Sequence, residues 1–455
     1  MTHSFSFNYH ERAYYFVWDK ESGSLHNVDY VAFLVVKNRF GENMTDHEKD
    51  DFSKLDSATI TEVNAELDIL VEQGVLDSPC TVTQNQKRVG EIKALCLHIC
   101  HDCNLRCKYC FADEGTYHTT DRAYMSLEVG CKAVDFLIEH SGKRRNLEID
   151  FFGGEPLMNL DVVKGIVEYA RGREQESGKT FSFTMTTNCV LLNDKTIEWL
   201  NREMSNVVLS IDGRPCVHNA VRKTANGKDC YDLILKNAQK FRSVRGDKSY
   251  YVRGTFTARN LDFASDVVAL NDAGFDQISL EPVVTDIPDL AIKEEHLPRI
   301  LEEYDKLAEI YIDRRKGDKW FNFFHFMIDL EGGPCVIKRL TGCGSGCEYL
   351  AVTPDGSLYP CHQFAEKEGY KMGNVFDGDI DMNVSLKFAK NIVTNKPDCA
   401  DCIAKYYCSG GCVANNLNYA GSMDKPYPIS CAMMRKRFEL SLAISAIKGA
   451  EQAQE

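Results

Sequence analysis

One short stretch of the chain has the cysteine spacing of a metal site. It follows the pattern Cys-x3-Cys-x2-Cys, with Cys103, Cys107 and Cys110. Three thiols on one short loop can bind three corners of an iron–sulfur cube, which takes four ligands in all. The fourth iron is then open to a small chelating molecule. Tyr109, between the second and third cysteines, can offer a flat face to a purine. The loop therefore predicts an iron–sulfur site with one exchangeable position.

A zinc knuckle is the alternative for this loop, because Cys-x2-Cys is also a zinc spacing. Zinc would need a further ligand, and Cys96, Cys100 and His101 are near in sequence. Cys96 and Cys100 alternate with apolar residues, so we interpret them as small buried strand residues rather than ligands.

Polar residues follow three later strand-like segments. Gly153, Gly154 and Glu155 come first: the glycines expose backbone groups, and Glu155 can accept a hydrogen bond from an ammonium group. Asn188 and Ser210 end the next two segments. A plain strand-to-helix turn is the alternative for the glycine motif, and ordinary turn and capping chemistry is the alternative for neighbouring Thr187 and Asp212.

Two arginines and a glutamate follow near the same strand ends. Arg222 and Arg253 have the fork geometry that pairs with a carboxylate. A solvated or structural role is the alternative for both arginines. Glu281 follows the sixth strand and is a weaker candidate for a substrate site.

The last 120 or so residues are rich in cysteine at regular spacings. The first two thiols follow Cys-x12-Gly-x4-Cys, the next four follow Cys-x2-Cys-x5-Cys-x3-Cys, and one more completes the set: Cys343, Cys361, Cys399, Cys402, Cys408, Cys412 and Cys431. Such a set predicts further metal centres, with two structural zinc sites as the alternative to iron–sulfur clusters.

The composition is that of a globular protein of several domains. The chain has 455 residues, 44% of them hydrophobic and 26% charged, and a net charge of -14, which argues against a nucleic-acid surface and an anionic membrane. We find no signal peptide and no apolar run of membrane-spanning length. The 19 cysteines then indicate metal ligation in a reducing, cytoplasmic setting.

Strands and helices alternate through the middle of the chain. Six strands are predicted at 94–99, 147–152, 181–186, 207–211, 251–256 and 277–280, with amphipathic helices between them. Six βα units fall short of the eight of a closed barrel, so we expect an open (β/α)6 sheet with a lateral mouth. Before it, a hairpin, a helix from Asp29 to Phe40 and a second helix ending at Gly74 make a small winged-helix-like unit. A plain cap over the barrel edge is the alternative for that unit.

These motifs together resemble the radical S-adenosylmethionine (SAM) enzymes. Their signature loop is Cys-x3-Cys-x-aromatic-Cys, they carry Gly-Gly-Glu-Pro one βα unit later, and some have the seven-cysteine extension called SPASM. The resemblance implies an α/β fold in three domains: 1–90, a winged-helix-like leader-peptide recognition domain; 91–330, a partial (β/α)6 TIM-type barrel; and 331–455, the SPASM domain.

The resemblance also implies SAM and three 4Fe-4S clusters. Cys103, Cys107 and Cys110 would ligate the SAM-binding cluster, and the residues implied around SAM are Tyr109, Gly153, Gly154, Glu155, Asn188, Ser210 and Arg222. The outer auxiliary cluster would take Cys399, Cys402, Cys408 and Cys431. The inner one would take Cys343, Cys361 and Cys412. Its fourth position would go to Cys347, to Cys335 or to a substrate thiolate.

Within this group, residues 341–350 and 360–364 look like the maturases of SCIFF peptides, short precursors rich in cysteine. Those enzymes join a cysteine sulfur to the α-carbon of another residue, often threonine. The SAM-derived radical removes an α-hydrogen, the thiolate closes the thioether, and the surplus electron leaves through the inner cluster. The implied partners are a cysteine-rich precursor peptide, bound through its leader, and an electron donor such as flavodoxin or ferredoxin.

Three alternatives remain at this stage. A formylglycine-forming sulfatase maturase would not need the N-terminal unit, so deleting residues 1–85 should leave its activity intact. A peptide epimerase or carbon–carbon crosslinking enzyme would differ in product mass. A zinc-bound peptide-binding protein without catalysis would contain no iron and would not cleave SAM.

Overall fold

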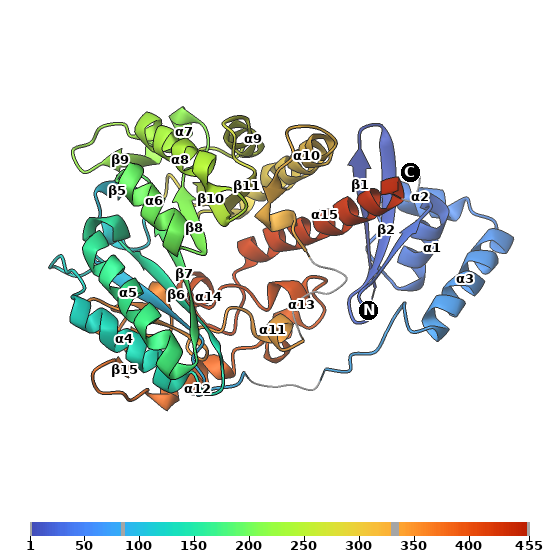
Figure 1. The fold of residues 1–455 in the computed structure, drawn as a ribbon. Helices are drawn as coiled ribbons and strands as arrows, with labels where there is room; N and C mark the ends of the chain where they lie inside the picture. Colours follow the sequence, from blue (N-terminus) through green and yellow to red (C-terminus); the bar gives the residue numbers. More distant parts are fainter. Residues whose placement is uncertain (1, 83–86, 329–335, 453–455) are drawn as a thin grey trace.

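The computed structural model describes residues 2–82, 87–328 and 336–452, arranged as shown in Figure 1. Cys335 and most of the predicted linker at 84–87 lie outside these ranges. None of the helices in the described ranges combines the length and apolar character needed to cross a bilayer.

The N-terminal unit is a three-stranded antiparallel sheet followed by three helices. The strands run in the order β1-β2-β3, so β3 lies at an edge. The bounds are β1 Thr2–Tyr9, β2 Arg12–Asp19, β3 Ser24–Val28, α1 Tyr30–Arg39, α2 Asp46–Ser53 and α3 Ser57–Glu72. The predicted hairpin and both predicted helices are present, together with a third strand and one further helix, α2, while the winged-helix class stays a prediction.

Local sequence signals explain where these helices begin. The Asp29 side chain accepts from the Ala32 N–H and caps α1, which confirms the predicted start. Thr45 and Glu48 form a capping box at α2. Apolar residues of β2, α1 and α3 then pack into a small core of their own, which includes Val17 and Leu67.

The central sheet contains all six predicted parallel strands. Their bounds are β4 Ala94–Cys100, β6 Asn146–Gly153, β7 Thr180–Thr187, β8 Asn206–Ser210, β10 Ser249–Phe256 and β11 Gln277–Pro282. The helices between and after them are α4 Leu127–His140, α5 Leu160–Ser177, α6 Asp194–Glu203, α7 Pro215–Val221, α8 Tyr231–Arg245, α9 Ala264–Asp272 and α10 Leu297–Arg315. The six strands lie side by side in chain order, as expected for an open βα barrel.

The sheet is larger than predicted, because ten strands join it. β12 (Asn322–Phe323) continues it beyond β11, and β13 (Tyr349–Val352) pairs in parallel with β4 at the other side. β14 (Ser357–Tyr359) and β15 (Gly373–Asn374) follow as antiparallel strands. Residues 349–359 alternate in sequence around a turn at Pro354, Asp355 and Gly356, a pattern that predicts a hairpin. The structure confirms this hairpin, but it belongs to the same sheet as the barrel strands.

Alternation along each strand separates a helix-covered face from an inner face. In β10, Val252 and Phe256 are completely buried, whereas the Arg253 side chain between them is 58% exposed. The carboxyl ends of β4 to β11 share one edge of the parallel sheet, so the polar residues that end these strands can lie near one another.

The remaining elements pack against the barrel and the N-terminal unit. Their bounds are α11 Val336–Thr341, α12 Met382–Ala389, α13 Lys405–Cys408, α14 Val413–Ala420 and α15 Pro428–Gln452. The amphipathic pattern of residues 433–447 predicts a helix after Cys431, and the structure confirms it within α15, which is longer at both ends. This helix packs along α10 and reaches the N-terminal sheet, as Figure 1 shows.

Candidate active site and thiol centres

The loop after β4 brings Cys103, Cys107 and Cys110 together. Cys107 lies in β5 (Leu105–Cys107), which pairs with β9 (Arg222–Thr224) in a separate two-stranded ribbon. Burial is the main reason that the pKa of each thiol is raised, to about 12 for Cys107. Cys107 and Cys110 also raise the pKa of Cys103, so the three sulfur atoms lie within electrostatic range of one another.

The two glycines after β6 allow a close approach to this loop. The Gly154 N–H donates to the Cys100 carbonyl at 2.8 Å, and a Cβ at Gly154 would lie 1.8 Å from the Asp102 carbonyl oxygen. Gly153 has φ +117°, a conformation that favours glycine. Side chains at either position would therefore push the glycine motif away from the cysteine loop.

Glu155 is 1% exposed, and its carboxylate already accepts three hydrogen bonds from the protein. One oxygen accepts from Thr187 Oγ1 at 2.8 Å and from the Leu157 N–H at 3.1 Å, and the other accepts from the Asn188 N–H at 2.7 Å. Burial raises the pKa of Glu155 to about 7 despite these donors. The carboxylate thus holds the end of β7 in place, and little of its accepting capacity is left for the ammonium group considered from the sequence.

Asn188 lies directly beside the cysteine loop. Its Nδ2 is 2.7 Å from Asn104 Oδ1 and 3.6 Å from Cys103 Sγ. Ser210 ends the next strand and is paired in register with Arg253. The structure therefore brings Asn188 to the first thiol and places Ser210 at the same edge of the sheet.

Arg222 and Tyr109 share one buried acceptor, Asp212. Arg222 contacts both Asp212 oxygens, at 2.9 and 3.0 Å, and the Tyr109 hydroxyl donates to the same carboxylate at 2.7 Å. Burial would raise the pKa of Asp212, but Arg222 and the hydrogen bonds hold it below its usual value. The sequence suggested that Tyr109 and Arg222 face the cofactor and left Asp212 as a turn residue. In the structure the three side chains fasten the cysteine loop to the end of β8, while the role of Tyr109 and Arg222 at the cofactor stays a prediction.

A buried imidazole pair lies behind the cysteine loop, and sequence reasoning missed it. His98 Nδ1 and His101 Nε2 are 3.0 Å apart, and both rings lie against Tyr117, with centroids 4.4 and 4.5 Å away. Burial lowers the pKa of His101 to about 4. Tyr117 donates its hydroxyl to the Gly153 carbonyl at 3.2 Å, so this stack supports the glycine motif from below.

Cys96 and Cys100 are buried in β4, as the alternating pattern predicted. The Cys100 thiol donates to the carbonyls of Asp102 and Glu155, both at 3.2 Å. These contacts confirm the interpretation of the two cysteines as strand residues.

A cluster of charged side chains lies at the ends of the last two barrel strands. Glu281 of β11 is 3.6 Å from Arg253, 3.6 Å from His325 and 3.9 Å from Arg437 of α15. Burial would raise the pKa of Glu281, but the surrounding cations lower it. Burial raises the pKa of Cys412, and the negative charge of Glu281 raises it further. This cluster therefore lies between the barrel mouth and the tail thiols.

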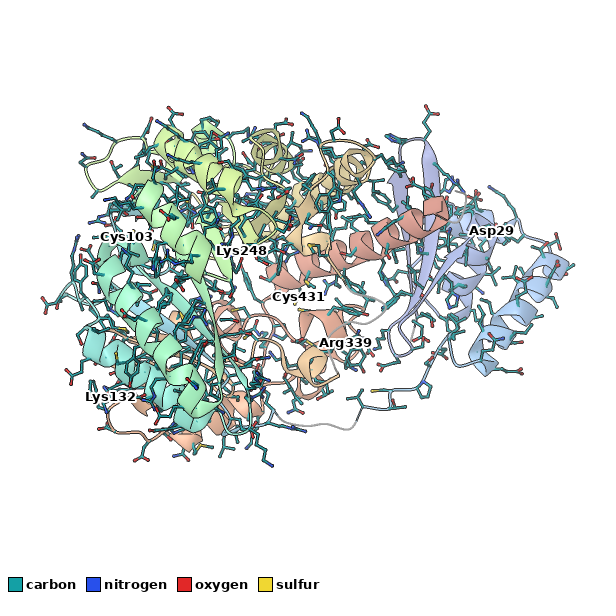
Figure 2. All side chains as sticks on the ribbon, viewed as in Figure 1. Asp29, Cys103, Lys132, Lys248, Arg339 and Cys431 are labelled. Atoms are coloured by element: carbon teal, nitrogen blue, oxygen red, sulfur yellow. The ribbon has the colours of Figure 1, made fainter. Side chains whose placement is uncertain are left out.

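Four tail thiols converge from two segments. Cys399, Cys402 and Cys408 lie on one short loop, and Cys431 lies in the first turns of α15 (Figure 2). Burial raises the pKa of Cys399 to about 12 and that of Cys431 to about 11, and the neighbouring thiols contribute to both shifts. These are the four residues assigned from the sequence to the outer site.

A second tail site brings Cys343, Cys361 and Cys412 together. Burial raises the pKa of Cys361 to about 12, and the nearby Cys343 and Cys412 thiols raise it as well. Cys347 is different: it is 1% exposed, and its thiol donates to the Ser385 carbonyl at 3.6 Å. Burial, and more weakly the Cys343 thiol, raises the pKa of Cys347, so Cys347 also lies within electrostatic range of this set. Cys335, the other candidate for a fourth protein ligand, lies outside the described residues.

The donor sets fit iron–sulfur clusters, because each is made of soft thiolates in groups of three or four. Among the described residues, no three His, Cys, Asp or Glu side chains are arranged around one point as ligands of a single metal ion. A further groove, about 460 Å³, is lined by residues of α6 and α8 and by none of these thiols.

Two family models match the chain. Residues 90–233 match a 4Fe-4S single cluster domain, and residues 343–403 match the SPASM iron–sulfur cluster-binding domain. The chain therefore carries iron–sulfur cluster domains in the barrel and in the tail.

Curated relatives are similar over most of the chain. The radical SAM cyclopropyl synthase TigE of Paramaledivibacter caminithermalis is 24% identical over 365 residues, which cover 75% of this chain and 71% of TigE. A cysteine-type anaerobic sulfatase-maturating enzyme of Clostridium perfringens is 23% identical over 331 residues, which cover 68% of this chain and 85% of that enzyme.

Solved structures share the fold. The structure of anSMEcpe with bound AdoMet and a Cp18Cys peptide has a TM-score of 0.64 at 18% identity, and the match covers 79% of this chain and 99% of anSMEcpe. The structure of Streptococcus suis SuiB bound to precursor peptide SuiA has a TM-score of 0.52 at 15% identity, and the match covers 91% of this chain and 95% of SuiB.

Proposed function

We propose that this chain, as a radical SAM enzyme of the SPASM group that modifies a peptide, installs a thioether between a cysteine sulfur and the α-carbon of another residue, with threonine as the first acceptor to test. The substrate would be a ribosomally made, cysteine-rich precursor. An electron donor such as flavodoxin or ferredoxin would serve it in a reducing cytoplasm.

One observation carries this proposal: two separate sites have three converging thiols each. The first is the Cys103 loop in the barrel, and the second is the Cys343, Cys361 and Cys412 set in the tail. A cube with three protein ligands leaves one iron for another molecule. SAM suits the barrel site, and a substrate thiolate suits the inner tail site, where the nearby Cys347 thiol donates to the Ser385 carbonyl.

At the barrel site the protein's own part is positioning. When bound, the cluster and SAM supply one-electron chemistry that starts a radical reaction. Asp212 fastens the cysteine loop through Arg222 and Tyr109, and Glu155 holds Asn188 beside Cys103. Two proteins of similar fold support this use of the site. The anSMEcpe structure contains AdoMet and a Cp18Cys peptide, and SuiB structures contain S-adenosylmethionine or the precursor peptide SuiA.

The charged cluster at Glu281 is the proposed entrance for the peptide. Arg253 is more than half exposed there, and its charge reaches His362, the residue after Cys361. Burial lowers the pKa of His362 to about 4, so its ring is neutral near pH 7. A peptide that crosses Arg253 and Glu281 would thus pass between the barrel end and the inner thiols.

The N-terminal unit offers a groove for the leader of the precursor. A groove of about 410 Å³ is lined by the start of β2, the end of β3 and the start of α1, including Tyr15, Asn27 and Tyr30. Because β3 is an edge strand, an extended peptide can add to it through main-chain hydrogen bonds.

A second candidate is favoured by the relatives. Sulfatase-maturating enzymes and a cyclopropyl synthase are among the proteins similar to this chain, so maturation of a sulfatase or carbon–carbon bond formation is the competing activity.

The test is anaerobic incubation of the reconstituted enzyme, SAM and a reductant with cysteine-rich peptides encoded beside the gene. Thioether closure removes two hydrogen atoms and protects one thiol from alkylation, so mass spectrometry is done before and after alkylation. The same loss of hydrogen with every thiol still open to alkylation would indicate a carbon–carbon product and would contradict the proposal.

A further inference from the structure

Trp18, near the end of β2, makes contacts far from its own sheet. It is 1% exposed, and its indole N–H donates to the Ile403 carbonyl at 3.3 Å. Its ring lies edge-on to Phe438 of α15, with centroids 5.5 Å apart, and 6.3 Å from Tyr407. Ile403 and Tyr407 lie between Cys402 and Cys408, while Phe438 lies two turns after Cys431. One side chain therefore touches both segments that supply the outer thiols.

Lys20 and Glu21, two and three residues after Trp18, reinforce this contact. Lys20 Nζ donates to the Ala400 carbonyl at 2.7 Å, and Glu21 accepts from the Tyr406 hydroxyl at 2.5 Å. The Lys20 and Glu21 side chains are both only 6% exposed. Ala400 and Tyr406 both belong to the loop between Cys399 and Cys408. The end of β2 is thus built against this loop, as the closeness of β2 to α13 and α15 in Figure 1 indicates.

The loop depends on these donors for physical reasons. Its ligands are spaced by short turns, so several carbonyls have no partner within a regular helix, and a buried carbonyl that loses its donor costs about 1–3 kcal/mol. Tyr407 and Phe438 pack against each other, with ring centroids 4.8 Å apart, and the indole covers this pair. Removing the indole would leave a cavity beside the two rings, which the surroundings fill only in part. Cys431 could then move relative to the other three ligands.

We propose that Trp18 is a positioning residue for the outer auxiliary cluster, and that the N-terminal unit serves as a structural cap on that cluster as well as a peptide-binding module. This inference rests on the proposed function, because it needs an iron–sulfur cluster at Cys399, Cys402, Cys408 and Cys431. It links the proposed leader groove to a redox centre through a single strand: the groove lies at the start of β2, and the cap lies at its end.

The experiment compares iron, sulfide and electron paramagnetic resonance (EPR) spectra of four anaerobically reconstituted full-length proteins. They are the wild type, Trp18→Ala, Cys431→Ala as a reference for loss of the outer cluster, and Trp320→Ala as a matched control. Trp320 is 42% exposed on the surface, and among the described residues no ring contact joins it to a thiol loop. We expect Trp18→Ala to lose about one third of its iron, one cube of three, and its reduced spectrum to match that of Cys431→Ala.

Two further measurements distinguish a local loss of the outer cluster from misfolding of the whole protein. The spectral change that SAM causes at the barrel cluster should persist in Trp18→Ala, which shows that the loss is local. Trp18→Phe keeps an aromatic ring at this position but removes the indole N–H donor. We therefore expect full iron content with faster release of one cluster to a chelator. The inference is overturned if Trp18→Ala keeps all its iron and the wild-type spectrum, or if Trp18→Phe and wild type release iron at the same rate. A wild type without any iron–sulfur cluster would instead contradict the proposed function.

Discussion

Arg222 faces Cys107 across the β5–β9 ribbon and forms a two-contact ion pair with the fully buried Asp212. The cysteine loop is therefore tied to the barrel through a charge pair rather than through apolar packing alone.

Arg222→Ala should destabilise the protein by about 3 kcal/mol, because it leaves the Asp212 charge buried without its main partner. Chemical denaturation of the metal-free chain measures this loss. Arg259→Ala is the matched control: its partner Asp289 is 75% exposed, so we expect a change below about 1 kcal/mol. Equal effects of the two substitutions would contradict a structural role for the buried pair.

Cys347→Ala should keep the full iron content, whereas Cys343→Ala should lose about one third of it. The physical reason is that the Cys347 thiol points to the Ser385 carbonyl, while Cys343 lies with Cys361 and Cys412. Iron and sulfide analysis checks both variants. If Cys347→Ala lost the inner cluster, that cluster would have four protein ligands, and direct binding of a substrate thiolate would need another explanation.

Tyr15→Ala should weaken binding of the precursor about tenfold. Tyr15 lines the groove beside Tyr30 and Phe33, with ring centroids 5.1 and 5.0 Å away. Fluorescence anisotropy with a labelled leader peptide measures the affinity. Tyr169→Ala on α5, a tyrosine outside this unit, is the control and should bind as the wild type does.

Acid should weaken the N-terminal unit through Glu48. Burial alone would raise the pKa of Glu48, but Lys37 and Thr45 lower it below its ordinary value. The ion pair with Lys37, 2.7 Å long, then adds stability above the pKa of the unfolded carboxyl, about 4.3, and loses it as the pH falls through the lower folded-state pKa. Glu48→Gln should be less stable than the wild type by about 1 kcal/mol at pH 6, and the gap should close towards pH 3. A gap that stays constant over this range would exclude the pair as its source.

Deletion of residues 1–80 should reduce the iron content by about one third as well as abolish leader binding, because it removes Trp18. This outcome changes how the sulfatase-maturase alternative is tested. Loss of activity on deletion would not distinguish the two functions, whereas Tyr15→Ala tests recognition with the cap intact. A deletion protein with three clusters would show that the outer thiols need no support from β2.

Much of the barrel could be predicted, because its signals are local. Six strands alternate or run apolar within a few residues, and each was found within about two residues of its predicted ends. The helix at α2 was missed, although Thr45 and Glu48 form the Ser/Thr-x-x-Glu signature of a capping box. That signal was present in the sequence and would have located the helix.

Other features had no local signal. In the sequence Asp212 has the pattern of a turn residue, and only the tertiary fold brings Arg222 into contact with it. The pairing of β13 with β4 joins residues about 250 positions apart. The same holds for His98, whose partner His101 is near in sequence but whose stack with Tyr117 depends on the path of the loop. Thiol spacing predicted which cysteines group together, whereas the side chains that support these groups came only from the tertiary fold.

The first two strands contact α15: His3 of β1 lies 2.8 Å from Glu439, and the Trp18 ring of β2 meets Phe438. During synthesis, this sheet must therefore wait for a segment that is made roughly 400 residues later. Until then, one apolar face of the sheet would stay uncovered. Assembly of the outer metal centre would follow the synthesis of α15, and the growing chain would depend on protection of that face until then.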